Sequence, residues 1–80
     1  MGDSVDVRLQ AIFGDVFGLK AEDYRPDLTS ERVGGWDSVL HLTLLLTLEQ
    51  QFGVSFDPEV AANLTSVPAI KQALADAGAA

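Results

Sequence analysis

Residues 34–53 read GGWDSVLHLTLLLTLEQQFG, and this stretch decides the fold of the chain. Its apolar residues recur at the spacing of a helix, which predicts a helix over residues 38–52. Gly53 follows the last apolar position and is expected to end the helix in a left-handed conformation. One side of this helix is predicted to face the core and carries His41, Leu44, Leu45, Leu48 and Phe52.

The start of this helix holds the most informative residue of the chain, Ser38. Asp37 before it is a good N-cap, because its carboxylate can accept the otherwise unpaired N–H groups of Val39 or Leu40. Ser38 is then the first helical residue, at the positive end of the helix dipole, where an attached phosphate would be favoured. Taken alone, the Asp37-Ser38 pair could equally be an ordinary helix start.

The second side of this helix carries more leucine than a solvated face needs. Because the core-facing positions already fill the interior stripe, some leucines are expected to stay at the surface and form a docking surface for partner proteins. The residues nearer this side are Leu40, Thr43, Leu46 and Thr47.

Helical spacing also predicts a first helix over roughly residues 4–17, which Gly18 would end. Residues 18–37 scatter their apolar groups without a regular period and are predicted to form a long loop. This loop can include a short helical turn near residues 21–24. Loops of this length in small domains are usually functional or held by buried anchors.

Two further helices are predicted after Gly53. A short one covers about residues 58–63, with Asp57 as its N-cap and a proline in its first turn. Thr65 or Ser66 can cap the last helix, which ends near Gly78. No strand pattern competes with these helices, so we expect an all-α fold, a small four-helix bundle.

The composition indicates one small acidic domain over residues 1–80. The chain has no cysteine, so neither a disulfide framework nor a thiolate metal site holds it together. A formal charge of −7 repels nucleic acids and anionic lipids, and the longest apolar run is three leucines. With no signal segment at the N-terminus, we expect a cytoplasmic monomer with neither a nucleic-acid nor a membrane partner.

The sequence shows neither a clear catalytic arrangement nor a metal-binding motif. Ser38 as a nucleophile would need a base within hydrogen-bond reach and a third group to orient that base. His41 is the only histidine, and we interpret it as a partly buried residue bonded to loop backbone. Without cysteine or a calcium-loop motif, no metal site is predicted.

The sequence resembles the acyl carrier protein family over nearly its full length. The D-S-[LV] signature is short, but its combination with two further motifs is fairly specific. The resemblance is carried by Trp36-Asp37-Ser38-Val39, Leu48-Glu49-x-x-Phe52 and Thr65-x-Val67.

The resemblance implies an acyl-carrier type of four-helix bundle that acts as a carrier, not as an enzyme. A phosphopantetheinyl transferase would attach a phosphopantetheine arm from coenzyme A to the hydroxyl of Ser38. Asp37 would then serve in capping and in recognition by the transferase. The thiol of the arm would hold an acyl group as a thioester, which a loading enzyme supplies and downstream synthase or transferase enzymes use.

By the resemblance, the exposed side of the second helix would meet partner enzymes, and its predicted docking residues are Val39, Leu40, Thr43, Leu46, Thr47 and Glu49. The family's fatty-acid carriers usually bear acidic residues on this side, whereas here only Glu49 is acidic. This departure favours a stand-alone carrier of a polyketide or related specialised pathway, and the start at Met1 favours a free-standing chain. The alternative is an aminoacyl or peptidyl carrier with the same serine chemistry. An unmodified helical module that binds a partner through Leu40 and Leu46 is the alternative of another class.

Overall fold

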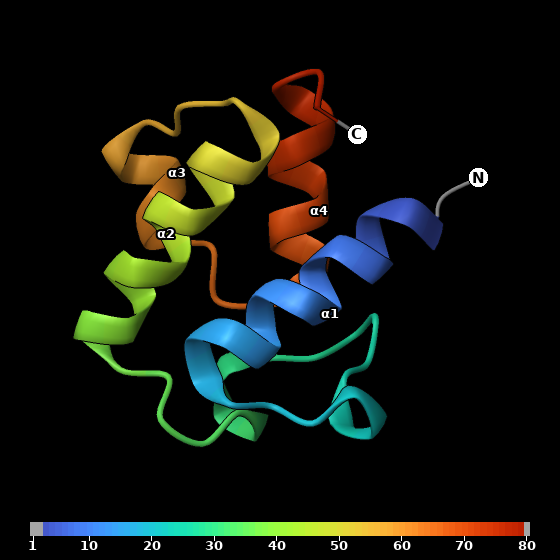
Figure 1. Cartoon of the computed structure of the whole chain (residues 1–80). Helices are drawn as coiled ribbons and strands as arrows, with labels where there is room; N and C mark the ends of the chain where they lie inside the picture. Colours follow the sequence, from blue (N-terminus) through green and yellow to red (C-terminus); the bar gives the residue numbers. More distant parts are fainter. Residues whose placement is uncertain (1–2, 80) are drawn as a thin grey trace.

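The computed structural model describes residues 3–79, and this part of the chain forms four α-helices and two short 3₁₀ helices (Figure 1). The all-α prediction is confirmed, because between residues 3 and 79 the only extended pairing is an isolated bridge. In chain order the elements are α1 (Asp3–Phe17), η1 (Ala21–Asp23), η2 (Ser30–Arg32), α2 (Ser38–Phe52), α3 (Pro58–Ala62) and α4 (Val67–Asp76).

Local signals set most of these boundaries. α2 has the predicted bounds, and Gly53 ends it with a φ of 66°, a left-handed conformation that a residue without a Cβ adopts easily. Ser66 caps α4, since its Oγ accepts the N–H of Ala69 at 3.2 Å. Asp57 is the N-cap residue of α3, as predicted, but only its backbone carbonyl bonds to the helix, and its side chain makes no capping hydrogen bond.

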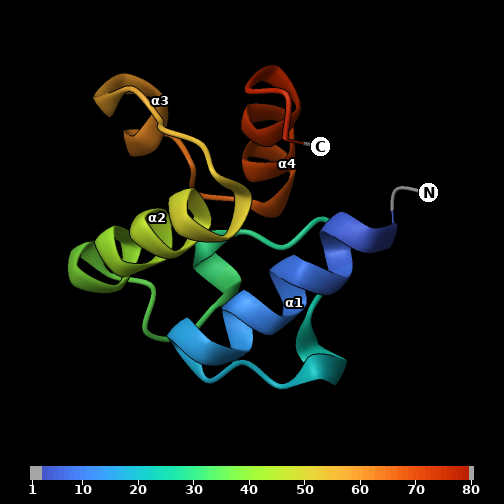
Figure 2. The same cartoon turned by 45° about the horizontal axis from the view of Figure 1, so that its top comes forward.

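The loop between α1 and α2 is more structured than the sequence pattern indicated. The turn expected near residues 21–24 is the 3₁₀ helix η1, whereas η2 was not predicted. Figures 1 and 2 show the loop running along α1 and then leading into the start of α2. Leu28 and Val33 anchor it in the core, each only 4% exposed.

A short pairing of backbone segments ties this loop to the start of α4. The N–H of Val67 donates to the carbonyl of Leu28 at 2.8 Å, and the N–H of Ser30 donates to the carbonyl of Thr65 at 2.9 Å. An isolated antiparallel bridge pairs Thr29 with Ser66 in the same place. Residues that are more than thirty positions apart are therefore held together beside η2.

The core is built from apolar side chains of α1, α2, α4 and the loop. α1 packs across α2, and Phe13 of α1 is fully buried at the centre of an aromatic group. Its ring lies 5.4 Å from that of Phe17 and 5.6 Å from that of Trp36, measured between centroids. The other residues with no exposed surface are Leu9, Leu44, Leu48, Val67, Ile70 and Leu74.

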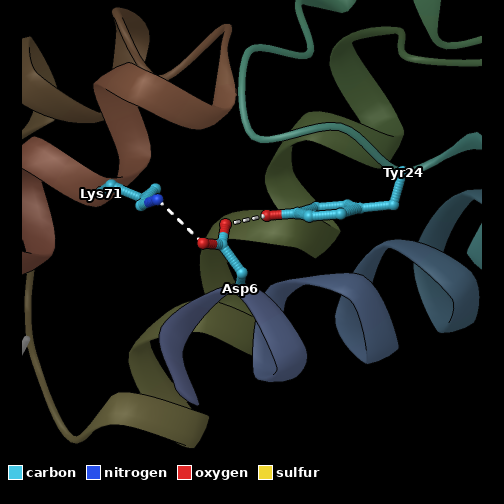
Figure 3. A network of polar contacts seen from close by, with 3 residues as sticks. All are labelled: Asp6, Tyr24 and Lys71. Carbon is cyan, nitrogen blue, oxygen red and sulfur yellow. Dashed lines mark hydrogen bonds and ion pairs between the residues drawn. The ribbon is translucent and has the colours of Figure 1, made fainter. Parts of the chain in front are cut away.

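One polar network crosses the bundle at the side of this core (Figure 3). The carboxylate of Asp6 in α1 accepts hydrogen bonds from the hydroxyl of Tyr24 at 2.8 Å and from Nζ of Lys71 in α4 at 3.0 Å. The network therefore joins α1, the loop and α4 through a single carboxylate.

The network changes the proton affinity of two of its members. Burial acts to raise the pKa of Asp6, but the hydrogen bonds from Lys71 and Tyr24 and the charge of Lys71 outweigh it and lower the pKa. Burial and the hydrogen bond to Asp6 raise the pKa of the Tyr24 hydroxyl. The folded state thus favours the ionised form of Asp6.

None of the helices between residues 3 and 79 combines the length and the apolar character that a membrane span requires.

The Asp6 network should make stability depend on pH. Asp6→Asn is expected to lower the free energy of unfolding by about 1 kcal/mol at pH 7, because the ionised carboxylate is lost. A group with a lowered pKa contributes its stability above the unfolded value, here 3.8, and loses it as the pH falls through the folded value. The difference between the two proteins should therefore shrink below about pH 4 in urea titrations.

Asp15→Asn serves as the matched control, because Asp15 is exposed on the same helix. It should change the free energy of unfolding by less than about 0.5 kcal/mol at any pH. An effect of Asp6→Asn that is equal at pH 7 and pH 3 would contradict the role of the ionised carboxylate.

Candidate functional site

Ser38 is exposed at the first position of α2, as predicted from the sequence. Asp37 has an extended backbone and caps the helix, because its Oδ1 accepts the N–H of Leu40 at 2.9 Å. The carbonyl of Asp37 also accepts the first regular helical bond, from the N–H of His41 at 2.8 Å. Asp37 therefore caps the start of α2 without any help from the hydroxyl of Ser38.

The same helix start leaves donors that no described residue uses. The backbone N–H groups of Ser38 and Val39 have no acceptor among residues 3–79. They lie at the positive end of the helix dipole, where an anion is stabilised by roughly 0.3 to 1 kcal/mol at an exposed site. A phosphate on the Ser38 oxygen would be favoured here, although the Asp37 carboxylate partly opposes its charge.

His41 links the segment before Ser38 to α3. Its Nδ1 accepts a hydrogen bond from Nε1 of Trp36 at 3.0 Å, and its Nε2 lies 2.9 Å from the carbonyl oxygen of Ala61. Because the indole N–H can only donate, Nδ1 must be unprotonated, and Nε2 then carries the hydrogen and donates to Ala61. These bonds select one neutral tautomer. The acceptor belongs to α3, so the predicted bond to loop backbone is wrong.

Trp36 is held from several sides. Its ring lies 5.0 Å from that of Phe17 and 5.6 Å from that of Phe13, and it stacks on His41 at 6.2 Å with an interplanar angle of 24°. Aromatic pairs at such distances add to the gain from burial. The residue two positions before Ser38 is thus fixed to the core, and it fixes the start of α2.

A cleft of about 460 Å³ opens beside Ser38, between the start of α2, the loop near η2 and the end of α3. Trp36 and His41 line one part of it, and the segments tied together by the backbone pairing line the other. The lining residues are Ser30, Trp36, Asp37, Ser38, His41, Ala62 and Thr65.

The predicted docking residues fall into exposed and engaged groups. Val39 is 72% exposed and Leu46 is 53% exposed, and Thr43 is exposed between them. The hydroxyls of Thr43 and Thr47 donate to the carbonyls of Val39 and Thr43, at 3.2 and 2.8 Å, so both are satisfied within α2. This face consequently offers its partners little free hydrogen-bonding capacity.

Leu40 and Glu49 are less available than the sequence indicated. Leu40 is half-buried, and its side chain approaches Gly35. The Oε2 of Glu49 accepts the N–H of Phe56 at 2.9 Å, which ties the end of α2 to the following loop. The single acidic residue predicted for the docking surface therefore has a partner inside the chain.

Leu42 was missed by the sequence reasoning. It is 59% exposed and falls three positions after Val39 and four before Leu46, so the three side chains form one row along α2. Its three- and four-residue spacing to two predicted docking positions was the signal that could have identified it. We call Val39, Leu42 and Leu46 the apolar row.

Catalytic and metal-binding arrangements are not found at the serine. Both ring nitrogens of His41 are engaged, so it is not available as a base for Ser38. Within residues 3–79 no group of three or more histidine, aspartate or glutamate side chains is placed to hold a metal ion.

The His41 bonds can be tested by a variant that keeps the stacked ring. His41→Phe removes the acceptor of the Trp36 N–H and the donor to Ala61, and we expect a loss of about 1 to 3 kcal/mol in the free energy of unfolding. Urea titration measures it. Gln50→Ala, at an exposed position of the same helix, should cost less than about 0.5 kcal/mol. Equal stabilities of the two variants would show that the bonds contribute nothing.

Comparison with known families matches residues 7–74 to the family described as PP-binding, phosphopantetheine attachment site. The match covers most of the chain and includes the start of α2, most of the core and the cleft. Proteins of this family carry a covalently attached phosphopantetheine group, and such domains are carriers that do not catalyse reactions themselves. The resemblance to carrier proteins noted in the sequence is thereby confirmed. The chain belongs to the phosphopantetheine-attachment family of carrier domains.

Proposed function

We propose that this chain, as a single domain over residues 1–80, is an acyl carrier protein whose attachment residue is Ser38. The observation that carries the proposal is the exposed hydroxyl of Ser38 at the start of α2, inside the region matched by the family. When attached, phosphopantetheine supplies a thiol that holds an acyl group as a thioester. Partner enzymes would load and unload that thiol.

The residues around Ser38 suit a phosphate ester. A phosphopantetheinyl transferase would form a bond between the Ser38 oxygen and the phosphorus of coenzyme A that carries the pantetheine. The diphosphate bond of coenzyme A breaks in the same step, adenosine 3′,5′-bisphosphate leaves, and the hydroxyl of Ser38 loses its proton to the transferase. The unpaired N–H groups of Ser38 and Val39 are placed to stabilise the resulting charge. Asp37 keeps the helix start fixed and presents a carboxylate for recognition by the transferase.

The docking surface of this carrier is proposed to be the apolar row with Thr43 and Thr47 beside it. No charged side chain lies between Ser38 and Leu48, so contact with partner enzymes depends on apolar burial more than on charge. Leu40 and Glu49 would contribute less, since both pack within the chain.

This apolar surface supports a polyketide or related specialised pathway as the setting, because carriers of fatty-acid synthesis usually show acidic residues there. An aminoacyl or peptidyl cargo would use the same serine and the same arm. Offering the modified protein to acyl-activating and amino-acid-activating enzymes, and measuring the mass of the loaded product, separates the two.

Attachment at Ser38 is tested by intact-mass measurement. The chain is incubated with coenzyme A and a transferase of broad specificity, and the mass should rise by one phosphopantetheine group. Ser38→Ala should abolish the gain, whereas Ser55→Ala, at another exposed serine, should retain it. No gain in the natural chain would favour an unmodified interaction module, and a gain that survives Ser38→Ala would place the arm elsewhere.

The apolar row is tested with charge-matched variants. Leu46→Glu should lower kcat/KM of the transferase about tenfold, because roughly 1 to 2 kcal/mol of apolar contact is lost. Val7→Glu is the control: Val7 is 64% exposed on α1, and the change adds the same charge away from α2. It should alter kcat/KM by less than about twofold, since only the overall field changes. Equal losses of kcat/KM in both variants would contradict a docking role. So would a large loss of thermal stability in Leu46→Glu, because Leu46 would then belong to the core.

A further inference from the structure

The cleft beside Ser38 is a shaped surface that the attachment reaction itself does not need. Ser38 is one of its lining residues, so a group bonded to the Ser38 oxygen can start in a cleft of about 460 Å³. We propose that this cleft receives the phosphopantetheine arm, which lies against Trp36 with its amide groups next to the hydroxyls of Ser30 and Thr65. The inference rests on the proposed attachment at Ser38.

The residues that line the cleft form one wall without free hydrogen-bonding groups and one wall with free hydroxyls. The indole N–H of Trp36 and both ring nitrogens of His41 are already engaged, so these residues present mainly ring surface. The hydroxyls of Ser30 and Thr65 form no hydrogen bond with any residue between 3 and 79. The cleft therefore combines one aromatic wall with two available hydroxyls.

Both walls are fixed before any ligand arrives. Phe13, Phe17 and His41 hold the ring of Trp36. The backbone bond from Ser30 to the carbonyl of Thr65 keeps the two hydroxyl-bearing residues side by side. A site that is already ordered loses little conformational entropy when a flexible chain settles in it.

The chemistry of the arm fits this division. Beyond its phosphate it carries a branched apolar segment and two amide groups before the terminal thiol. The branched segment can pack on the indole ring, and the amides can exchange hydrogen bonds with hydroxyls that both donate and accept. The interior beyond the cleft is filled by fully buried side chains such as Leu44 and Leu48, so the arm is expected to lie along the surface.

Trp36 gives a direct readout, because it is the only tryptophan of the chain. The unmodified and modified proteins are compared, after intact mass has established that the arm is attached. Acrylamide should quench Trp36 fluorescence less in the modified protein, because the arm covers the ring. An arm labelled with carbon-13 should give nuclear Overhauser effects between its methyl groups and the indole protons.

A pair of threonine variants tests the polar wall. Thr65→Val keeps the shape but removes one hydroxyl, and it should lower the ratio of bound to free arm about 2- to 12-fold, which the Overhauser intensities report. Thr29→Val makes the same change at a residue that does not line the cleft and whose hydroxyl makes no capping hydrogen bond, and it should leave the ratio unchanged.

The outcomes separate the inference from the function on which it rests. Absence of a mass gain would overturn both. A mass gain with unaltered quenching and no Overhauser effect to Trp36 would overturn the cleft alone and leave Ser38 as the attachment residue. Equal effects of Thr65→Val and Thr29→Val would remove the hydroxyl contact from the inference.

Discussion

The hydrogen bond from the Trp36 indole to Nδ1 of His41 is the interaction on which the site depends. It connects the segment before Ser38 to α2, and the other nitrogen of the same ring connects α2 to Ala61 in α3. Phe13 anchors the indole from the core side. These contacts connect the start of α2, the end of the loop and α3, and residues of all three segments line the cleft beside Ser38.

The protein is acidic as a whole, but the part of α2 that follows Ser38 is uncharged and largely apolar. The chain carries twelve acidic residues, yet the stretch from Val39 to Leu48 has none, and the one acid at its end, Glu49, is bonded to the backbone of Phe56. A partner that approaches Ser38 along α2 meets methyl groups and leucines. The overall negative charge acts at longer range and favours basic partners, whereas short-range contact selects for an apolar surface.

The parts of the structure that were predictable from sequence are those set by local rules. Asp37 as the cap of α2, Gly53 as its end and Ser66 as the cap of α4 follow from chemistry within four residues. The acceptor of His41 and the exposure of Leu42 were not predictable in this way, because each depends on which distant segment packs nearby. The cleft belongs to the same class, since it needs the pairing of residues 28–30 with residues 65–67.

Two serines at helix starts differ in whether their hydroxyls are needed to cap the helix. Ser66 occupies the capping position itself, and its Oγ accepts the N–H of Ala69, so modifying it would remove the cap of α4. Ser38 stands one position later, after Asp37, whose carboxylate already performs the capping. The hydroxyl of Ser38 is not used to cap the helix, so it can be esterified without loss of the cap. The Asp-Ser order thus leaves the capping to Asp37 and a free hydroxyl to Ser38, the residue that we propose as the attachment point.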